Sequence, residues 1–313
     1  MTESITLTIE EALNKADDLA KAGKRDLAAG LYSAVLKARP DNVAARAGLE
    51  RLGQATPEAE ETRIMGLYRE GRFLEVEQQS KLLIEKGYKT ARIFNFLAIA
   101  QQRQGRLAEA AESYKSAIET DPNYADSYNN LANVLNDMDK VDQAVTYCNK
   151  ALEIRPDYPE ALNNKGNALR ANGALASARD HFERAIALAP NYGQAHGGLG
   201  TVLIEMEEPE AAKNSLENAL RLTPDDPNIW SNLGAALQDL GEFDEALISI
   251  NRALELDANH ANAINNRGHV LQELEQLTEA ESCFLEAIRI QPIYADAYIN
   301  LGLTQQMQNR LVC

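Results

Sequence analysis

The sequence predicts an all-α protein built as a solenoid of stacked helix–turn–helix repeats. Prolines close segments that recur every 34 residues, as at Pro122, Pro156 and Pro190. Small and apolar residues recur at helical spacing within these segments. No run of alternating polar and apolar residues indicates a strand. The 313-residue chain is long for one globular core, and it suits an array that grows by repetition.

Each segment that ends at a proline is predicted to be the second helix of a pair. It carries small residues at helical spacing, such as Ala144, Cys148 and Ala151, and the proline then prevents the helix from continuing. The first helix carries an aromatic residue, then leucine three positions later, then Gly or Ala, as in YNNLANVL (128–135). The turn between the two helices is predicted at three glycines, Gly105, Gly173 and Gly241.

The 34-residue phase divides the chain into three predicted regions, which are residues 1–56, 57–294 and 295–313. The first is an N-terminal cap or small subdomain with an extra helix at 43–52, and it opens with a capping box at Thr8 and Glu11. The stretch from Gly53 to Pro57 is a predicted hinge. The second region holds seven consecutive units, and the third is an incomplete repeat.

The period, the first-helix pattern, the second-helix pattern and the closing proline together resemble the tetratricopeptide repeat (TPR). Six consecutive units over residues 91–294 carry this resemblance, and the unit at 57–90 is degenerate but in phase. The resemblance implies a right-handed superhelix whose first helices line a concave groove. It also implies that the protein binds other proteins or peptides.

Asparagine recurs in the first helices although it is a weak helix former. Residues 34 apart form rows along the predicted groove, and the asparagines of one unit share a helix face. The first row contains Asn130, Asn164, Asn232, Asn266 and Asn300. The second row contains Asn129, Asn163 and Asn265, and the third contains Asn133 and Asn167.

These rows have two interpretations. A primary amide can pair with the C=O and the N–H of a peptide unit, so the rows can hold an extended peptide. They resemble the asparagine ladder of O-linked N-acetylglucosamine transferases, whose repeats are similar to those of bacterial TPR-bearing glycosyltransferases and sulfotransferases. Alternatively, the amides bond between neighbouring units and were copied by shared ancestry. The ladder is interrupted at Gly197 and Gly198.

The charge of the chain narrows its partners. A formal net charge of -16 disfavours nucleic acid and anionic membranes as partners, which leaves protein or peptide ligands. We expect four first-helix carboxylates to favour basic or neutral ligands, namely Asp137, Glu205, Asp239 and Glu273. The N-terminus lacks the pattern of a secretory signal, and no apolar run reaches membrane-spanning length, so we expect a cytoplasmic protein.

No catalytic, cofactor or metal motif is apparent. The four histidines lack ligand spacing, His196 occupies a core aromatic position, and Cys148 and Cys283 are expected to be small core residues. We therefore expect no enzyme activity, cofactor or metal in this chain. Two functional classes remain: an interaction scaffold, and the substrate-recognition arm of a glycosyltransferase or sulfotransferase whose catalytic domain lies beyond residue 313.

The C-terminal repeat is predicted to lack its second helix. Tyr298 and Leu301 would then present apolar surface that terminal repeats normally avoid. Either the chain has been cut from a longer one, or two copies form a homodimer through this uncapped repeat.

Overall fold

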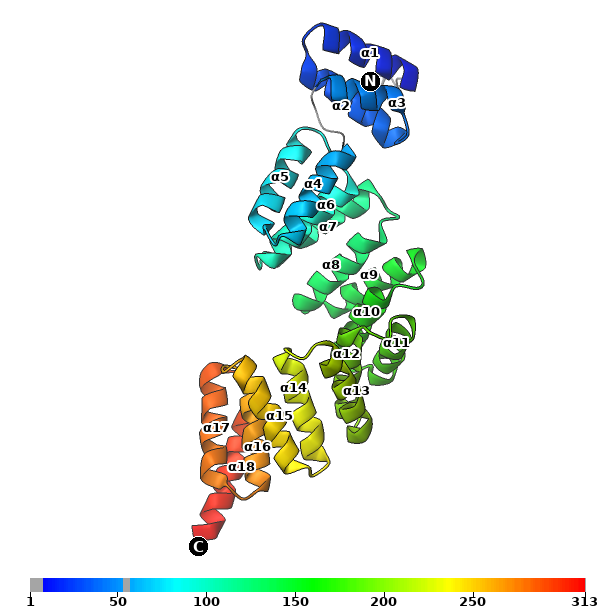
Figure 1. Cartoon of the computed structure of the whole chain (residues 1–313). Coiled ribbons are helices and arrows are strands. Elements are labelled where there is room, and N and C mark those ends of the chain that lie inside the picture. Colours follow the sequence, from blue (N-terminus) through cyan, green and yellow to red (C-terminus); the bar gives the residue numbers. More distant parts are fainter. Residues whose placement is uncertain (1–7, 53–56, 313) are drawn as a thin grey trace. The chain divides into compact units, whose positions relative to one another are not determined.

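The structure, a computed structural model, describes residues 8–52 and 57–312. These residues form 18 α-helices and contain no strand (Figure 1). The prediction of an all-α repeat fold is confirmed.

The helices belong to two compact units, residues 1–140 and 141–313. Unit 1 holds α1 (Ile9–Lys21), α2 (Arg25–Ala38), α3 (Val43–Arg51), α4 (Pro57–Arg69), α5 (Phe73–Glu85), α6 (Ala91–Arg103), α7 (Leu107–Thr120) and α8 (Ala125–Asp137). Unit 2 holds α9 (Val141–Ile154), α10 (Pro159–Ala171), α11 (Leu175–Leu188), α12 (Gly193–Glu205), α13 (Pro209–Leu222), α14 (Pro227–Asp239), α15 (Phe243–Leu256), α16 (Ala261–Glu273), α17 (Leu277–Ile290) and α18 (Ala295–Val312).

The border between the units lies inside the predicted repeat 125–158, between α8 and α9. The regions predicted from the sequence have other borders, after residues 56 and 294, and these stay predictions. The predicted hinge includes residues 53–56, which lie outside the described residues.

Residues 8–52 begin with the predicted capping box. The Thr8 N–H donates to the Glu11 carboxylate at 2.8 Å, and the Glu11 N–H donates to the Thr8 hydroxyl at 3.3 Å. Helices α1, α2 and α3 pack around the buried Tyr32 ring, and a Cβ on Gly48 would lie 2.5 Å from that ring. The predicted capping box is therefore formed, and α3 lies within the predicted helix at 43–52.

A small residue in each first helix receives a large residue from its second helix. In unit 2 a Cβ added to Gly166 would lie 2.8 Å from Phe182, and one added to Gly234 would lie 2.4 Å from Ile250. Real Cβ atoms do not approach other atoms so closely, so glycine allows the two helices of the pair to meet. Cys148 and Cys283 are buried as predicted.

The turns between paired helices require a left-handed residue. The predicted glycines Gly105, Gly173 and Gly241 have φ values of 76°, 74° and 76°. In three other repeats the same position is not glycine: Asp139, Glu207 and Glu275 have φ values of 57°, 59° and 60°. Side chains in this region strain the backbone, so these three turns are held by the packing of the helix pairs.

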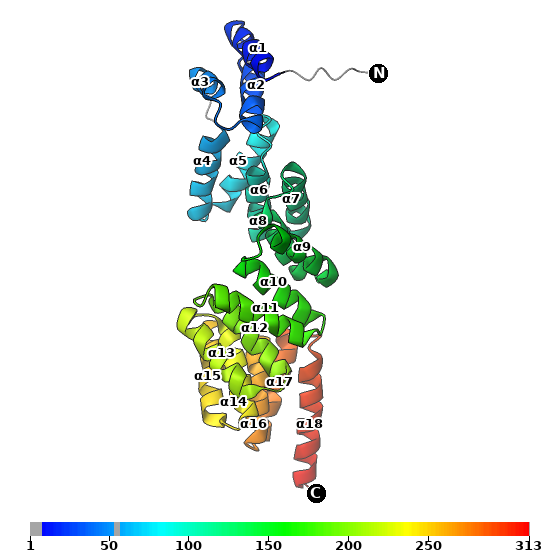
Figure 2. The same ribbon diagram turned by 90° about the vertical axis from the view of Figure 1, so that its right-hand side faces the viewer.

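The last helix differs from the other first helices of unit 2. Helix α18 has 18 residues, whereas α12, α14 and α16 have 13 each. In both views its C-terminal end extends past α16 and α17 (Figures 1 and 2). Tyr298, Ile299 and Leu303 are 51%, 61% and 48% exposed, while Leu301 is only partly exposed. The predicted apolar surface exists, but Leu301 is not its centre.

Candidate functional site

Three first-row asparagines of unit 2 bond to the preceding repeat. The side-chain N–H of Asn300 donates to the Asn265 amide oxygen at 3.2 Å. Asn266 donates to the Ser231 hydroxyl at 3.2 Å and Asn232 donates to the Thr201 hydroxyl at 3.0 Å. Part of each amide is therefore used to join neighbouring repeats.

Unit 1 shows the same arrangement. Asn130 donates to the buried Asn95 amide oxygen at 3.1 Å and accepts from Asn129 at 3.3 Å. At the start of unit 2, Asn163 donates to the half-buried Asn164 at 3.5 Å. The alternative interpretation of the rows, bonding between units, thus describes a contact that the fold makes.

The second row does not lie on an accessible surface. Asn129, Asn163 and Asn265 are only 6%, 5% and 7% exposed. Ile299 has the same register in the last repeat and is 61% exposed, because no further first helix packs over it in the described residues. Direct peptide contact does not fit the burial of these three asparagines, although Asn265 also lines a hollow in unit 2.

The third row contains two amides that form no hydrogen bond to another described residue. Asn133 on α8 and Asn167 on α10 are half-buried, and neither forms a hydrogen bond to another described residue. In later repeats the same position holds Thr201 and His269, and both form hydrogen bonds within the protein. The His269 Nδ1 accepts from the Gln238 side chain, so a neutral His269 carries its proton on Nε2.

Two first-row asparagines line a hollow of about 330 Å³ in unit 2, the first-helix hollow. Its lining comes from α12, α14, α16 and α18, and consists of Ile204, Ala235, Gln238, Asp239, Asn265, Asn266, His269, Asp296, Ile299 and Asn300. The sequence brings these residues together because they occur at similar register positions in successive first helices. The hollow therefore combines amides, two carboxylates and apolar side chains.

The carboxylates of the first helices differ in their electrostatic state. Burial raises the pKa of Asp239, and Glu207 adds to this, whereas His269 opposes it. Burial also raises the pKa of Asp137 in unit 1, where Gln102 opposes it. Glu205 instead forms an ion pair with Arg170 at 2.7 Å, so it is not available to a basic ligand. Glu273 is exposed.

The interruption of the ladder has a steric cause. A Cβ on Gly198 would lie 2.4 Å from the Phe182 ring. The ring thus occupies the room that an asparagine side chain would need, and the predicted gap is filled rather than open. Gly197 is different, because a Cβ there would make ordinary contact with Ile229 at 3.4 Å.

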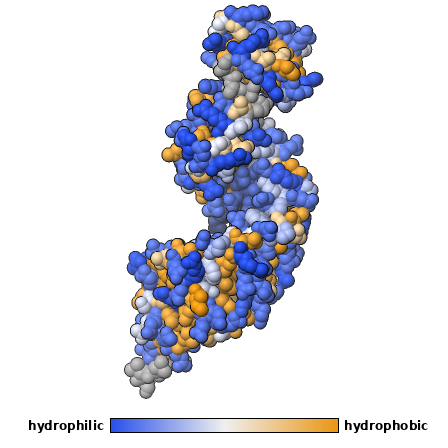
Figure 3. Space-filling model, viewed as in Figure 1, coloured by the Kyte–Doolittle hydropathy of each residue, from blue (hydrophilic) through white to orange (hydrophobic). Residues whose placement is uncertain are grey.

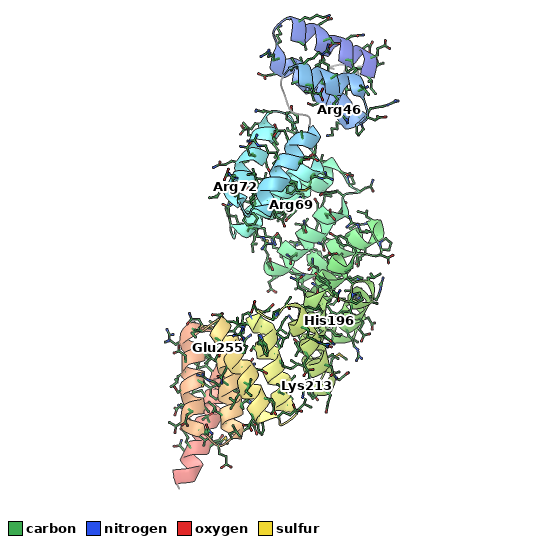
Figure 4. All side chains as sticks on the ribbon, in the orientation of Figure 1. Arg46, Arg69, Arg72, His196, Lys213 and Glu255 are labelled. Carbon is green, nitrogen blue, oxygen red and sulfur yellow. The ribbon has the colours of Figure 1, made fainter. Side chains whose placement is uncertain are left out.

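His196, labelled in Figure 4, is half-buried and has a polar contact in addition to its predicted packing. Its Nε2 lies 3.0 Å from the Pro190 carbonyl, and since that carbonyl can only accept, Nε2 carries the proton. Trp230 Nε1 donates to the Pro224 carbonyl at 2.7 Å in the same way. These aromatic residues hold the proline loop against the first helix.

The described residues contain no group of His, Cys, Asp or Glu that could hold a metal ion. Within the same residues, no helix is long and apolar enough to cross a membrane.

Sequence comparison identifies the repeats. Tetratricopeptide repeat families match residues 13–49, 123–191, 169–230 and 225–293, and a TPR repeat family matches residues 102–139. The chain belongs to the tetratricopeptide repeat family. No curated protein sequence matches this TPR chain.

Solved structures show the same fold. The APC/C hetero-tetramer Cut9–Hcn1 matches with a TM-score of 0.71 at 19% identity, over 94% of the TPR chain and 55% of the Cut9–Hcn1 chain. The TPR chain thus spans about half the length of that relative. The Pseudomonas aeruginosa pilF structure matches with a TM-score of 0.58 at 22% identity, over 70% of this chain and 97% of its own. YrrB, a TPR protein with an unusual peptide-binding site, is 31% identical over 60% of this chain and 97% of its own, with a TM-score of 0.46.

Proposed function

We propose that this TPR protein is an interaction scaffold that binds an extended peptide segment along the first helices of unit 2. The observation that carries the proposal is the first-helix hollow, in which Asn266 and Asn300 lie near Asp239 and Asp296. Repeat arrays present surfaces of this kind to protein partners.

The remaining hydrogen-bonding capacity of the first row suits a peptide backbone. The amide nitrogens of Asn232, Asn266 and Asn300 donate to the preceding repeat, while no described residue donates to their Oδ1 atoms. Each Oδ1 can accept a peptide N–H. The sequence led us to expect that each amide pairs with both the C=O and the N–H of a peptide unit. In this interpretation each amide only accepts from a peptide N–H. Asn167 can offer both its amide N–H and its amide oxygen to the peptide.

A basic side chain of the peptide matches the hollow. Asp239 and Asp296 supply negative charge, and partial burial raises the pKa of Asp239. A lysine or arginine would stabilise this carboxylate, while Ile299 and Ala235 would contact the aliphatic part of the side chain. With net gains of about 0.5–1.5 kcal/mol per hydrogen bond, we expect weak binding, on the order of micromolar for a short peptide.

The test uses an immobilised library of random 12-residue peptides. We expect wild-type protein to select peptides rich in lysine or arginine, and Asp239→Asn combined with Asp296→Asn to lose this preference. Asn167→Ala should weaken capture without changing the preference. Glu217→Gln is the matched control, because this exposed carboxylate lies on the second helix α13. If the double variant selects the same peptides with the same affinity, the hollow does not set specificity.

The homodimer through the C-terminal repeat stays a prediction. Leu303→Glu tests it better than Leu301→Glu, since Leu303 is the more exposed residue. Light scattering should show a dimer that this substitution converts to a monomer. No observation favours the alternative function, a recognition arm of a glycosyltransferase or sulfotransferase.

A further inference from the structure

Lys165 replaces a core leucine of the repeat. Leu131, Leu199 and Leu233 occupy the same register in other first helices and are at most 9% exposed. Lys165 on α10 and Arg267 on α16 are half-buried basic residues at this register, while Arg63 on α4 has the same register but is exposed. A cation in a position that normally stabilises the core requires an explanation outside packing.

The Lys165 side chain lies in a hollow of about 390 Å³ between α9, α10 and α11, the Lys165 hollow. Its lining consists of Asn149, Leu152, Glu153, Pro156, Lys165, His181 and Arg184. Three basic groups therefore line one cavity in a chain whose net charge is -16. The one carboxylate, Glu153, forms an ion pair with Lys150 at 2.8 Å.

The basic groups of the hollow lower one another's pKa. Burial lowers the pKa of Lys165, and Arg184 lowers it further, while Cys148 opposes this. Burial also lowers the pKa of His181, to which Lys165 and Arg184 add, while the Ser177 carbonyl and Asp180 oppose it. Among the described residues, no carboxylate forms an ion pair with Lys165 or Arg184.

His181 is oriented for a further ligand. Its Nδ1 lies 2.7 Å from the Ser177 carbonyl, which can only accept, so Nδ1 carries a proton. When the ring is protonated, Nε2 becomes a second donor. Lys165, Arg184 and the Asn149 amide are the other donors of the hollow.

The Arg267 hollow provides an internal comparison. It has a volume of about 600 Å³ and lies around the equivalent residue of a later repeat. There Glu286 occupies the register of Arg184, and it binds Arg289 through hydrogen bonds of 2.8 and 2.6 Å. Arg267 donates to the Cys283 sulfur at 3.4 Å, and Glu281 also lines the cavity. The Arg267 hollow thus has two lining carboxylates, Glu281 and Glu286, for its two basic groups, whereas the Lys165 hollow has only Glu153 beside three basic groups.

We propose that the Lys165 hollow binds a phosphate group, held by Lys165 and Arg184, with the Asn149 amide as a further donor. Phosphate fits because its charge of about -1.5 to -2 offsets several cations, and its oxygens accept several charge-assisted hydrogen bonds. The group can come from free phosphate or from a phosphorylated residue of a partner. This site uses the second helices and is independent of the first-helix hollow.

Lys165→Leu is the central variant because it restores the residue that other repeats carry. We expect it to raise the melting temperature of unit 2. The fluorescence of the single tryptophan, Trp230, would monitor the unfolding. The same change should lower phosphate affinity by about tenfold or more. Arg184→Glu, which copies the charge of Glu286, should have a similar effect on affinity. If Lys165 had only a structural role, Lys165→Leu would not raise the melting temperature and lower the phosphate affinity together.

Calorimetry would compare sodium phosphate, a short phosphoserine peptide and the same peptide with serine, at matched ionic strength set with sodium chloride. Equal affinity per phosphate indicates free phosphate as the ligand, and tighter binding of the phosphopeptide indicates a phosphorylated partner. Arg267→Leu is the matched control and should leave both affinities unchanged. The proposal is overturned if wild type binds neither phosphate probe above chloride, if Lys165→Leu and Arg184→Glu bind as wild type does, or if Arg267→Leu loses binding equally.

Discussion

The side-chain amide of Asn300 donates to the amide oxygen of Asn265, 3.2 Å away and 35 positions earlier in the chain. Asn130 makes the same contact with Asn95 in unit 1, at 3.1 Å. In each pair the exposed-side asparagine of one repeat satisfies a buried asparagine of the preceding repeat. The recurrent asparagines are therefore part of the contact between repeats, whatever they also bind.

Asn300→Ala should destabilise unit 2 by roughly 1–2 kcal/mol, because it leaves the buried Asn265 oxygen without its donor. Urea unfolding followed by Trp230 fluorescence measures the change. Asn130→Ala in unit 1, where unfolding is followed by circular dichroism, should cost less, since the Ser127 hydroxyl also donates to Asn95, at 3.3 Å. Asn167→Ala is the control and should change stability by less than about 0.5 kcal/mol. An equal loss in Asn300→Ala and Asn167→Ala would contradict this role.

The stability of the protein can be increased at the three turns that lack glycine. Glu275→Gly should stabilise unit 2 by about 0.5–1 kcal/mol, because glycine adopts a φ of 60° without strain but gains more freedom on unfolding. The reciprocal variant Gly241→Ala should destabilise the same unit by about 1–2 kcal/mol. Thermal melting of the two variants against wild type checks the opposite signs. A destabilised Glu275→Gly would show that the glutamate side chain matters more than the backbone.

Much of the fold could be predicted from the sequence because the 34-residue period fixes helix positions, turns and core residues together. Helices α6 to α17 lie where the period places them, and the Thr8 capping box forms as expected. The border between the two units could not be predicted, because the repeat at 125–158 continues the period without a change in composition.

The site was less predictable from the sequence. The register of a residue in the repeat tells on which face of the helix it lies, but not how deeply its side chain is buried. Asn265 and Asn266 are neighbours in adjacent rows, yet the following first helix buries Asn265 and leaves Asn266 half-exposed. The contact between Phe182 and Gly198 joins two repeats and has no local signal. The Lys165 position did have a signal, since a lysine stands in a row of leucines.

Glu77 should make the stability of unit 1 depend on pH. The Arg106 guanidinium is the main cause that lowers the pKa of Glu77 to about 2; burial opposes it, and Lys81 and Gln104 also contribute. Because the folded pKa lies below the ordinary value of 4.5, the stabilisation is complete above pH 4.5 and is lost as the pH falls toward 2. Hydrogen exchange of α5 to α7 should show that Glu77→Gln removes part of this acid sensitivity. Identical acid profiles for the variant and wild type would show that the pair does not stabilise unit 1.

Ion pairs between successive second helices repeat in the same register with either polarity. Glu77 pairs with Arg106 in unit 1, whereas in unit 2 Arg179 pairs with Glu208, and Lys213, labelled in Figure 4, pairs with Glu242. Apolar residues gather over α14 to α17 of the same unit (Figure 3). The fold therefore provides a geometry for the pair that does not depend on which partner carries the positive charge.

Lys213→Glu should destabilise unit 2 by about 0.5–1 kcal/mol, because it places two carboxylates together at a partly exposed site. The double variant Lys213→Glu with Glu242→Lys should regain most of this loss, since it reproduces the polarity of Glu77 and Arg106. Urea unfolding at low and high salt measures both steps, and the difference between the variants should shrink at high salt because the charges are screened. The control Glu273→Lys makes the same charge change at an exposed carboxylate on α16, outside the pair, and it should not rescue Lys213→Glu to the same extent. If the double variant is no more stable than Lys213→Glu alone, the pairs depend on their polarity and the register does not supply a common geometry.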